Sequence, residues 1–348
     1  MDLPSFCREL PKVELHAHLN GSLSTATLLQ LQRNLADSGL VDKTDVFLNK
    51  FHIGSGDSRN LSECFELFNI AHSLTITPAS LALATRLTLQ EFQDDGCCYI
   101  ELRSTPRETP HMNRRQYIET IIETISSHSL SHLTIIAKYI VSIDRKQSID
   151  AANEITELAI EFHRTYPNIL VGIELSGDPI VGQFIVLQPY FVKARDNGLK
   201  ISLHCGEVCN SKEIIQMLDF KPDRIGHGTC IIPRMCGTDE TWEKMQQMKI
   251  PVEICLTSNL KCKAMDDYAS HHFKEFYEAN IPVILCTDDK GVFCTSLSEE
   301  YRICGESFSF TRSQLARLAL NACQHVFAED CRKLLNDKVL NFINKHSL

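Results

Sequence analysis

The chain has 348 residues, of which 43% are hydrophobic and 23% are charged, with 15 Gly and 12 Pro. This ordinary globular composition excludes a disordered, collagen-like or coiled-coil protein. The 35 basic and 44 acidic residues give a net charge of −9, so we expect no nucleic-acid partner, because proteins that bind nucleic acid broadly carry basic surfaces.

The compartment follows from the N-terminus, the apolar runs and the cysteines. The first residues lack the basic and apolar segments of a signal peptide. The longest apolar run, residues 133–143, is too short to cross a bilayer, so we expect no membrane contact. The 15 cysteines are odd in number and show no CxxC spacing. We therefore expect reduced, mostly buried cysteines in a cytosolic protein.

Eight short β-rich runs alternate with helical segments along the chain. From the second run onward their starts lie 24 to 36 residues apart, which is the length of one strand–helix unit. The runs cover residues 13–19, 98–103, 134–143, 169–175, 199–204, 223–227, 251–256 and 282–286. Strands that alternate with helices form parallel sheets, and eight such units predict a closed (β/α)8 TIM barrel of the α/β class. We expect one barrel domain over residues 1–348.

Two segments fall outside the repeating unit. Residues 20–96, between the first two runs, predict a helical insertion that would cover the barrel mouth as a lid. Within it, the segment 60–63 resembles a capping box, with apolar residues following at helical spacing. Near the C-terminus, Thr311 and Gln314 predict the start of an extra helix. Its apolar stripe of Leu315, Leu318, Ala319 and Ala322 is expected in the core.

Polar residues gather where the predicted strands end. In α/β barrels the chemistry lies at the carboxyl ends of the strands, so these residues are candidates for the site. The strand ends carry His16, His18, Arg103, Ser104, Thr105, Arg107, Asp144, Gly177, His204, Glu207, His227, Ser258, Asn259, Asp288 and Asp289. Four histidines and several acidic groups would therefore meet at one rim of the barrel.

His16 and His18 indicate a metal site. Residues i and i+2 of a strand point to the same face, so both imidazoles can bind one ion. An isolated pair of this kind is as easily one buried and one exposed histidine, but His204 and Asp288 join it at other strand ends. Three imidazoles and one carboxylate suit zinc, and iron or cobalt less exclusively. The fourth run ends without the lysine that bridges two metals in many barrel hydrolases, so we expect one Zn²⁺.

Three further residues would complete a hydrolytic site. A metal with an open position lowers the pKa of a bound water toward about 7, and His227 is placed to act on that water. Glu207 is out of phase with His204 and should project toward a substrate; partial desolvation would raise its pKa, so that it holds a proton. Asp288 and Asp289 are neighbours whose side chains diverge, so one can bind metal and the other a substrate.

Seven motifs, in order along the chain, resemble those of the adenosine deaminase family. They are residues 11–22 (PKVELHAHLNGS), 102–107 (LRSTPR), 175–179 (LSGDP), 204–207 (HCGE), 224–228 (RIGHG), 255–259 (CLTSN) and 286–291 (CTDDKG). The resemblance implies hydrolytic deamination of a purine. It implies that zinc is bound by His16, His18, His204 and Asp288.

The same resemblance assigns the catalytic and base-binding roles. Glu207 would protonate the purine nitrogen N1, and His227 would orient and deprotonate the zinc-bound water. Asp289 would bind N7, and the backbone of Gly177 would contact N3. The hydroxide adds to carbon 6 and the amine leaves.

The expected substrate is a nucleoside monophosphate. Asn20 stands where nucleoside-specific members typically carry Asp, and a neutral amide would tolerate a 5′-phosphate that a carboxylate would repel. Thr105 and Arg107 could bind that phosphate through a hydroxyl and a cation. The resemblance adds His18, His72, Ser104, Pro106, Asp144 and Gly177 to the substrate-binding residues. The best candidate reaction converts N6-methyl-AMP and water to IMP and methylamine.

Two alternatives remain open from the sequence. The same chemistry could act on adenosine itself, giving inosine. The chain could also be an inactive family member that serves as a binding protein, although it retains every predicted metal ligand. We expect a small-molecule purine nucleotide as the partner and a monomeric protein.

Overall fold

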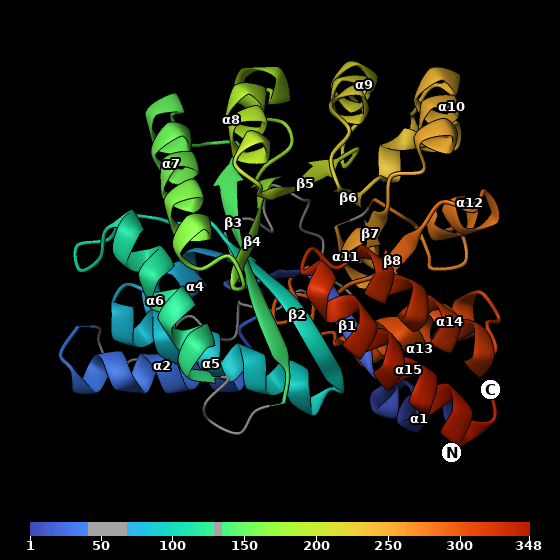
Figure 1. Cartoon of the computed structure of the whole chain (residues 1–348), viewed down its shortest axis with the longest axis horizontal. Helices are drawn as coiled ribbons and strands as arrows, with labels where there is room; N and C mark the ends of the chain where they lie inside the picture. Colours follow the sequence, from blue (N-terminus) through green and yellow to red (C-terminus); the bar gives the residue numbers. More distant parts are fainter. Residues whose placement is uncertain (41–67, 129–133, 263) are drawn as a thin grey trace.

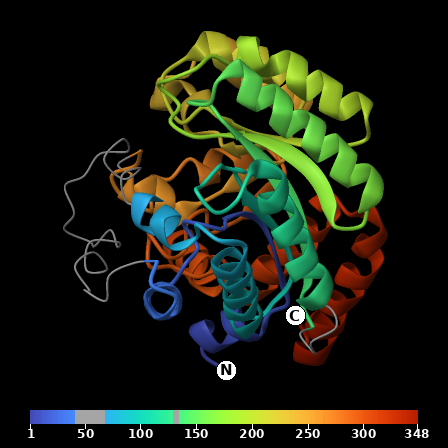
Figure 2. The same cartoon turned by 90° about the vertical axis from the view of Figure 1, so that its left-hand side faces the viewer.

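The computed structural model describes residues 1–40, 68–128, 134–262 and 264–348. Its centre is an eight-stranded parallel sheet in the order β1 to β8, which confirms the predicted barrel (Figure 1). The strands are β1 Lys12–His18, β2 Cys97–Ser104, β3 Ile136–Asp144, β4 Leu170–Ser176, β5 Lys200–Cys205, β6 Arg224–His227, β7 Val252–Ile254 and β8 Val283–Leu285. Figure 2 shows how strongly this sheet curves within its layer of helices.

Helices cover the outside of the sheet. The α-helices are α1 Leu3–Glu9, α2 Thr25–Asp37, α4 Phe68–Leu74, α5 Pro78–Asp94, α6 Arg114–His128, α7 Ile149–Thr165, α8 Phe184–Asp196, α9 Ser211–Phe220, α10 Asp239–Met248, α11 Leu256–Lys261, α12 Phe273–Glu278, α13 Leu297–Ser307, α14 Arg312–Ala322 and α15 Arg332–His346. Short 3₁₀ turns are η2 Thr229–Ile231, η3 Pro233–Met235, η4 Cys323–His325 and η5 Glu329–Cys331. Because helices shield the sheet, strands such as β4 are buried along their whole length.

The barrel closes between its last and first strands at a single bridge. Asp288, three residues after β8, pairs with Ala17 in β1. Its backbone N–H donates to the carbonyl of His16 at 2.8 Å, and the N–H of His18 donates to the carbonyl of Asp288 at 3.1 Å. The closing bridge therefore brings Asp288 beside the two histidines of β1.

Serine and threonine caps set where several helices begin. Thr311 accepts from the backbone of Gln314 and the Gln314 side chain accepts in return, so the predicted capping box at the start of α14 is confirmed. Its predicted stripe, Leu315, Leu318, Ala319 and Ala322, is buried. The helices described between β1 and β2 are α2, α4 and α5. The capping signal predicted at 60–63 lies outside the described residues.

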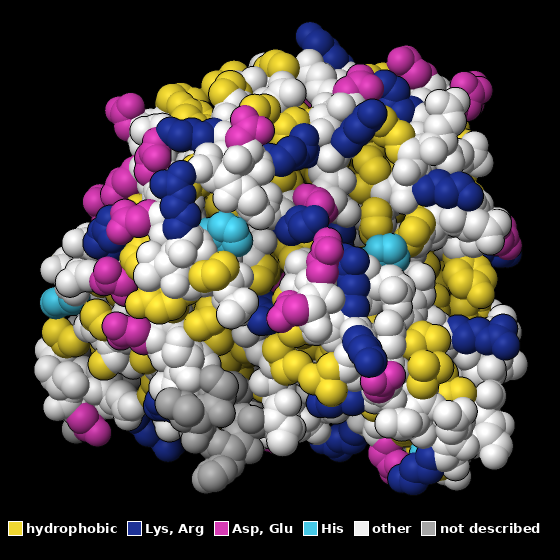
Figure 3. All heavy atoms as spheres, viewed as in Figure 1, with side chains coloured by type: hydrophobic (Ala, Val, Ile, Leu, Met, Phe, Trp, Pro, Cys, Tyr) yellow, Lys and Arg dark blue, Asp and Glu magenta, His cyan; other side chains and the backbone are white. Residues whose placement is uncertain are grey.

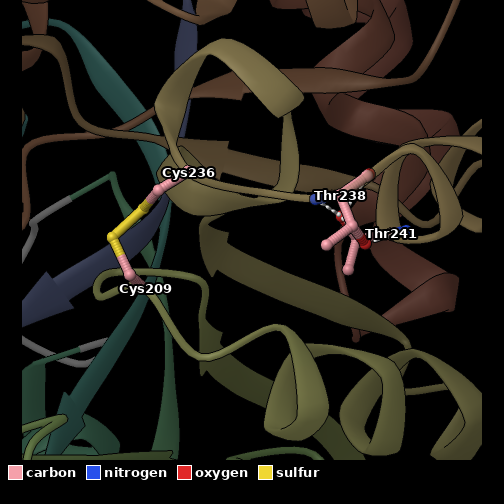
Figure 4. The surroundings of a disulfide bond; sticks show 4 residues. All are labelled: Cys209, Cys236, Thr238 and Thr241. Atoms are coloured by element: carbon pink, nitrogen blue, oxygen red, sulfur yellow. Dashed lines mark hydrogen bonds between the residues drawn. A yellow bond between two sulfur atoms is a disulfide. The ribbon is translucent and has the colours of Figure 1, made fainter.

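The cysteines depart from expectation in one place. Cys209 and Cys236 form a disulfide with their Cα atoms 5.7 Å apart (Figure 4), so the expectation that every cysteine is reduced is wrong for this pair. The two residues lie on different loops, 27 positions apart, and only the fold brings them within the distance that a disulfide requires. Twelve other cysteines of the described chain are free, and most of them are buried.

The surface shows mixed charge. On the face in Figure 3, basic and acidic side chains are interspersed with apolar ones. Among the described residues, none of the helices combines the length and hydropathy that crossing a bilayer requires. The chain termini lie close together in Figures 1 and 2, beside α1 and α15.

Candidate active site

Four histidines and Asp288 converge at the carboxyl ends of the strands. The ring centres of His16 lie 4.6 Å from those of His204 and 5.1 Å from those of His18 and His227. His18 Nε2 is 3.1 Å from His204 Nε2. Asp288 Oδ1 lies 3.4 Å from His16 Nε2 and 3.5 Å from His18 Nε2. The fold thus gathers all four predicted metal ligands in one cluster, with His227 beside them.

Hydrogen bonds behind the rings fix which nitrogen faces the cluster. His204 Nδ1 donates to the carbonyl of Leu175 at 2.8 Å. The ring proton is therefore on Nδ1, and Nε2 keeps a lone pair that can bind a metal. His16 Nδ1 lies 2.6 Å from Glu253 Oε2. Burial lowers the pKa of His16, but its contacts with Asp288 and Glu253 outweigh burial and raise the pKa to about 9. Metal binding at His16 would therefore displace a proton.

Asp288 is held in a constrained position. Its backbone lies in the left-handed region, with φ 60°, a conformation that residues other than glycine adopt rarely and often at functional sites. Ser258 donates to its Oδ2 at 2.6 Å. Burial disfavours the charge, but the surrounding histidines hold the pKa of Asp288 well below its usual value. An ionised carboxylate beside three imidazoles is a ligand set typical of zinc.

These residues fit a metal ion on two observations. His16 Nε2 is buried and has no hydrogen-bond partner among the described residues. One ligand atom from each of His16, His204, His227 and Asp288 lies within 4.8 Å of the others, and His18 forms a second such group with Glu174 and His204. Distance alone does not separate His227 from the predicted ligands.

A network of buried charges lies beneath the histidines, and we call it the charged floor. It alternates sign across four strands and comprises Glu174, Arg103, Glu253, Arg224 and Glu101. Arg103 pairs with Glu174 and with Glu253, and Arg224 Nε donates to Glu253 Oε1 at 2.6 Å. Because Glu253 also accepts from His16, the floor orients a predicted metal ligand.

Glu207 follows β5 and faces the same cluster. Its Oε1 lies 3.8 Å from His227 Nε2, and its side chain is 12% exposed. Its Oε2 is buried without a hydrogen-bond partner in the described part of the chain. Burial, reinforced by the charge of Asp288, raises the pKa of Glu207 to about 8. The carboxyl group therefore carries a proton at neutral pH and can donate it.

A cavity of about 600 Å³ opens above these groups. It is lined by most of the predicted substrate-binding residues, which are His18, Asn20, His72, Ser104, Thr105, Arg107, Asp144, Gly177 and Asp289. Pro106 does not line it. Phe293, to which the sequence assigned no role, does. A cavity of this size can enclose a small ligand.

The mouth of the cavity carries the groups predicted to bind phosphate. Arg107 Nη2 donates to the carbonyls of His72 and Thr75, at 3.0 and 2.9 Å, and so ties α4 to the loop after β2. Its Nη1 is buried and has no partner among the described residues, and neither has Asn20 Oδ1. Burial, with the nearby Arg107, lowers the pKa of His72 to about 3, so this ring is neutral.

Gly177 lies where a side chain is excluded. Its φ is 93°, and a Cβ built there would lie 2.4 Å from Asp144 Oδ1. The glycine therefore leaves its backbone accessible to the cavity beside Asp144.

Several important residues had no predicted role. The charged floor was missed, although charges inside β-rich runs, such as Glu101 and Arg103 in 98–103, are a signal of buried ion pairs. Asn259 was noted at a strand end without a role; its Nδ2 contacts His227 Nδ1 at 3.2 Å.

Comparison with known proteins agrees with this geometry. The sequence profile of the family described as "Adenosine deaminase" matches residues 11–342. The chain belongs to the adenosine deaminase family. This membership confirms the resemblance of the seven motifs.

Several relatives that cover almost the whole chain are named N6-methyl-AMP deaminase. A Bos taurus protein named "N6-Methyl-AMP deaminase" is 40% identical over 332 residues, covering 94% of this chain and 93% of its own. The apo structure of the N6-methyl-AMP deaminase from Arabidopsis thaliana superposes with a TM-score of 0.87 at 38% identity, covering 99% of this chain and all of that one. An Arabidopsis ADAL structure complexed with IMP gives 0.87 at 39% identity, covering 98% and 99%.

Proposed function

We propose that this adenosine deaminase family member hydrolyses 6-substituted purine nucleoside monophosphates, with N6-methyl-AMP and water giving IMP and methylamine. The observation that carries the proposal is the placement of the buried Glu207 carboxyl group beside the histidine and aspartate cluster in one cavity. The names of the relatives and the IMP complex of an Arabidopsis protein support the nucleotide as substrate.

We propose one zinc ion, held by His16, His18, His204 and Asp288. A bound zinc would act as a Lewis acid that lowers the pKa of a coordinated water toward about 7. The support is the donor set, the orphaned His16 Nε2 and the hydrogen bonds that turn the Nε2 lone pair of His204 toward the cluster. Glu253 would orient His16 from behind.

The remaining residues would bind and protonate the base. Glu207 would donate its proton to N1, which makes carbon 6 more electrophilic, while His227 would hold the attacking water. Water adds at carbon 6 and gives up both of its protons. One passes to the exocyclic nitrogen, so that its bond to carbon 6 breaks and methylamine leaves, and the other returns to the Glu207 carboxylate as the carbonyl at carbon 6 forms. Asp289 would bind N7, and the Gly177 backbone would contact N3.

The phosphate would lie at the mouth of the cavity. Arg107 Nη1 is a buried donor without a hydrogen-bond partner among the described residues, and it can donate to a phosphate oxygen. Asn20 Oδ1, also buried without a partner, can only accept, so Asn20 would contact the phosphate through its amide nitrogen. Ser104 and Thr105 would add hydroxyls, with Pro106 shaping their loop. His18, His72 and Asp144 would border the ribose and phosphate.

Steady-state kinetics with N6-methyl-AMP, AMP and adenosine tests the substrate. We expect the highest kcat/KM for N6-methyl-AMP. The highest value for adenosine would overturn the choice of nucleotide, while retaining the deamination chemistry. No turnover of any of the three would favour a binding protein.

Elemental analysis of the purified protein tests the metal. We expect one zinc per chain, and we expect a chelator to abolish activity that zinc restores. A protein that neither contains nor takes up a transition metal would contradict the proposed site.

We also propose a single-domain monomer of the cytosol. The lid would be the insertion 20–96, of which residues 41–67 lie outside the described residues. The support for a reducing compartment is that most cysteines of the described chain are free and buried; the Cys209–Cys236 disulfide is the exception. Light scattering at micromolar concentration should give one 39.4 kDa chain; a dimer mass would contradict this.

A further inference from the structure

Behind His227, a chain of buried hydrogen bonds runs away from the cavity. Asn259 in α11 places its amide Nδ2 3.2 Å from His227 Nδ1, and its Oδ1 lies 3.2 Å from His271 Nε2. His271 Nδ1 in turn accepts from the backbone N–H of Phe273 at 3.0 Å. Asn259 and both histidines are buried.

The last hydrogen bond of this series fixes which atom donates in each of the others. A backbone N–H can only donate, so His271 Nδ1 is an acceptor and the proton of that neutral ring is on Nε2. His271 Nε2 then donates to Asn259 Oδ1, which leaves the Asn259 amide hydrogens facing His227. His227 Nδ1 must therefore accept, and its proton is on Nε2, which points into the cavity. Because each of the two rings accepts a hydrogen bond at Nδ1, neither can carry a second proton there, and both rings are neutral.

A second contact holds the backbone of His227. This residue has φ 64°, in the left-handed region that residues other than glycine rarely adopt. His272 Nε2 donates to the carbonyl of His227 at 2.7 Å. The rings of His271 and His272 stack with centres 4.3 Å apart and planes 22° apart. One pair of neighbouring histidines thus holds both the backbone and, through Asn259, the ring of His227.

We infer that Asn259, His271 and His272 are positioning residues that fix His227 as a hydrogen-bond donor to the cavity rather than as a metal ligand. His227 Nε2 lies 3.8 Å from Glu207 Oε1 and 3.9 Å from Asp288 Oδ2. It can donate to the oxygen of an attacking water but cannot accept that water's proton. This assignment rests on the proposed function for its role in turnover, and it replaces the expectation that His227 is a base.

The contrast with the other histidines supports this assignment. His204 donates from Nδ1 to a carbonyl. His16 Nδ1 lies 2.6 Å from Glu253 Oε2 and 3.2 Å from Arg103 Nη1, and the shorter contact with the carboxylate makes it a donor. For both rings Nε2 is therefore the nitrogen available to a metal. His227 meets an amide donor at Nδ1 instead. Hydrogen bonding therefore separates three rings that distance leaves equivalent.

Asn259→Asp tests the inference because it keeps the shape and removes the donor. A carboxylate accepts from both neighbours, so His227 should move its proton to Nδ1. We expect kcat to fall about 100-fold, as for removal of one preorganised donor, with KM and zinc content little changed. His271→Gln keeps a donor and should retain most activity, whereas His271→Leu should resemble Asn259→Asp.

Nitrogen-15 NMR of histidine-labelled protein reads the tautomer without turnover, with the His227 signals identified by their loss in His227→Asn. We expect protonated Nε2 in the original protein and protonated Nδ1 in Asn259→Asp. A protonated Nδ1 in the original protein, or an unchanged tautomer in the variant, would overturn the inference. If no purine is turned over, the proposed function fails while the NMR result still decides the tautomer.

Discussion

The charged floor and the cavity above it differ in whether their buried polar atoms have partners. In the floor, Arg103 and Arg224 are each paired with two carboxylates. Among the residues that line the cavity, Glu207 Oε2 and Arg107 Nη1 are buried without a hydrogen-bond partner in the described chain, and so is His16 Nε2 in the histidine cluster. Folded proteins leave few such atoms, since each costs about 1–3 kcal/mol. Their convergence indicates that bound metal and substrate supply the missing partners, while the floor supplies orientation.

The largest effect on activity should come from the cavity residue Glu207, when it is changed to Gln. The amide cannot deliver a proton to the purine, so we expect kcat to fall about 10²- to 10⁴-fold. Zinc content, measured on the same sample, should stay the same, because Glu207 is outside the proposed ligand set. Near-normal kcat would remove Glu207 from the mechanism.

For the charged floor, we expect Glu253→Gln to lower the affinity for zinc. The neutral side chain orients His16 less strongly and leaves Arg103 and Arg224 with one carboxylate fewer, so zinc affinity should fall about 10- to 100-fold. Competition with a chromogenic chelator measures it. Glu161→Gln removes a carboxylate from an exposed ion pair with Arg115 and should leave the affinity unchanged. Equal affinity in both variants would show that the floor does not support the metal.

At the mouth, Arg107→Ala should raise KM for the nucleotide roughly 10- to 100-fold, since a charge-assisted hydrogen bond is worth about 1.5–3 kcal/mol. KM for the matching nucleoside should change much less. Arg107 also ties the His72–Thr75 turn, and an equal rise for both substrates would mean that it acts through that turn and not on phosphate.

The pH dependence should report the raised pKa of Glu207. Only the protonated carboxyl donates, so kcat should fall about tenfold per pH unit above the pKa of the complex. The pKa is about 8 without a metal, and a nearby cation would lower it, so the alkaline limb should begin at or below that value. A kcat that still rises at about pH 9 would exclude a proton-donating Glu207.

The smallest effect is expected from a glycine substitution, tested with a matched pair of variants. Gly39 has φ 70° and open space around its Cβ position, so Gly39→Ala should cost only about 1–2 kcal/mol of unfolding free energy, measured with urea. Gly177→Ala adds the clash with Asp144 and should also impair activity. Equal activity in the two variants would show that the cavity wall tolerates a side chain at Gly177.

The sequence predicted the barrel well because strands buried on both faces form apolar runs. Boundaries differed where a helix begins early: the run 251–256 is a strand only over Val252–Ile254, since Leu256 starts α11. The histidines were found because strand ends share one rim. The charged floor and the Asn259–His271 contact were missed because they join distant segments, and their partners depend on strand register and loop placement that spacing does not encode.

The bridge between Ala17 and Asp288 links completion of the fold to the chemistry. The backbone bonds that join the two ends of the sheet also carry the carboxylate to His16 and His18. A partly folded chain with an undocked eighth strand would have an incomplete coordination sphere. Zinc should therefore bind the closed barrel and not the partly folded chain, and so stabilise the junction between β8 and β1. The melting temperature should rise in proportion to the logarithm of the free zinc concentration.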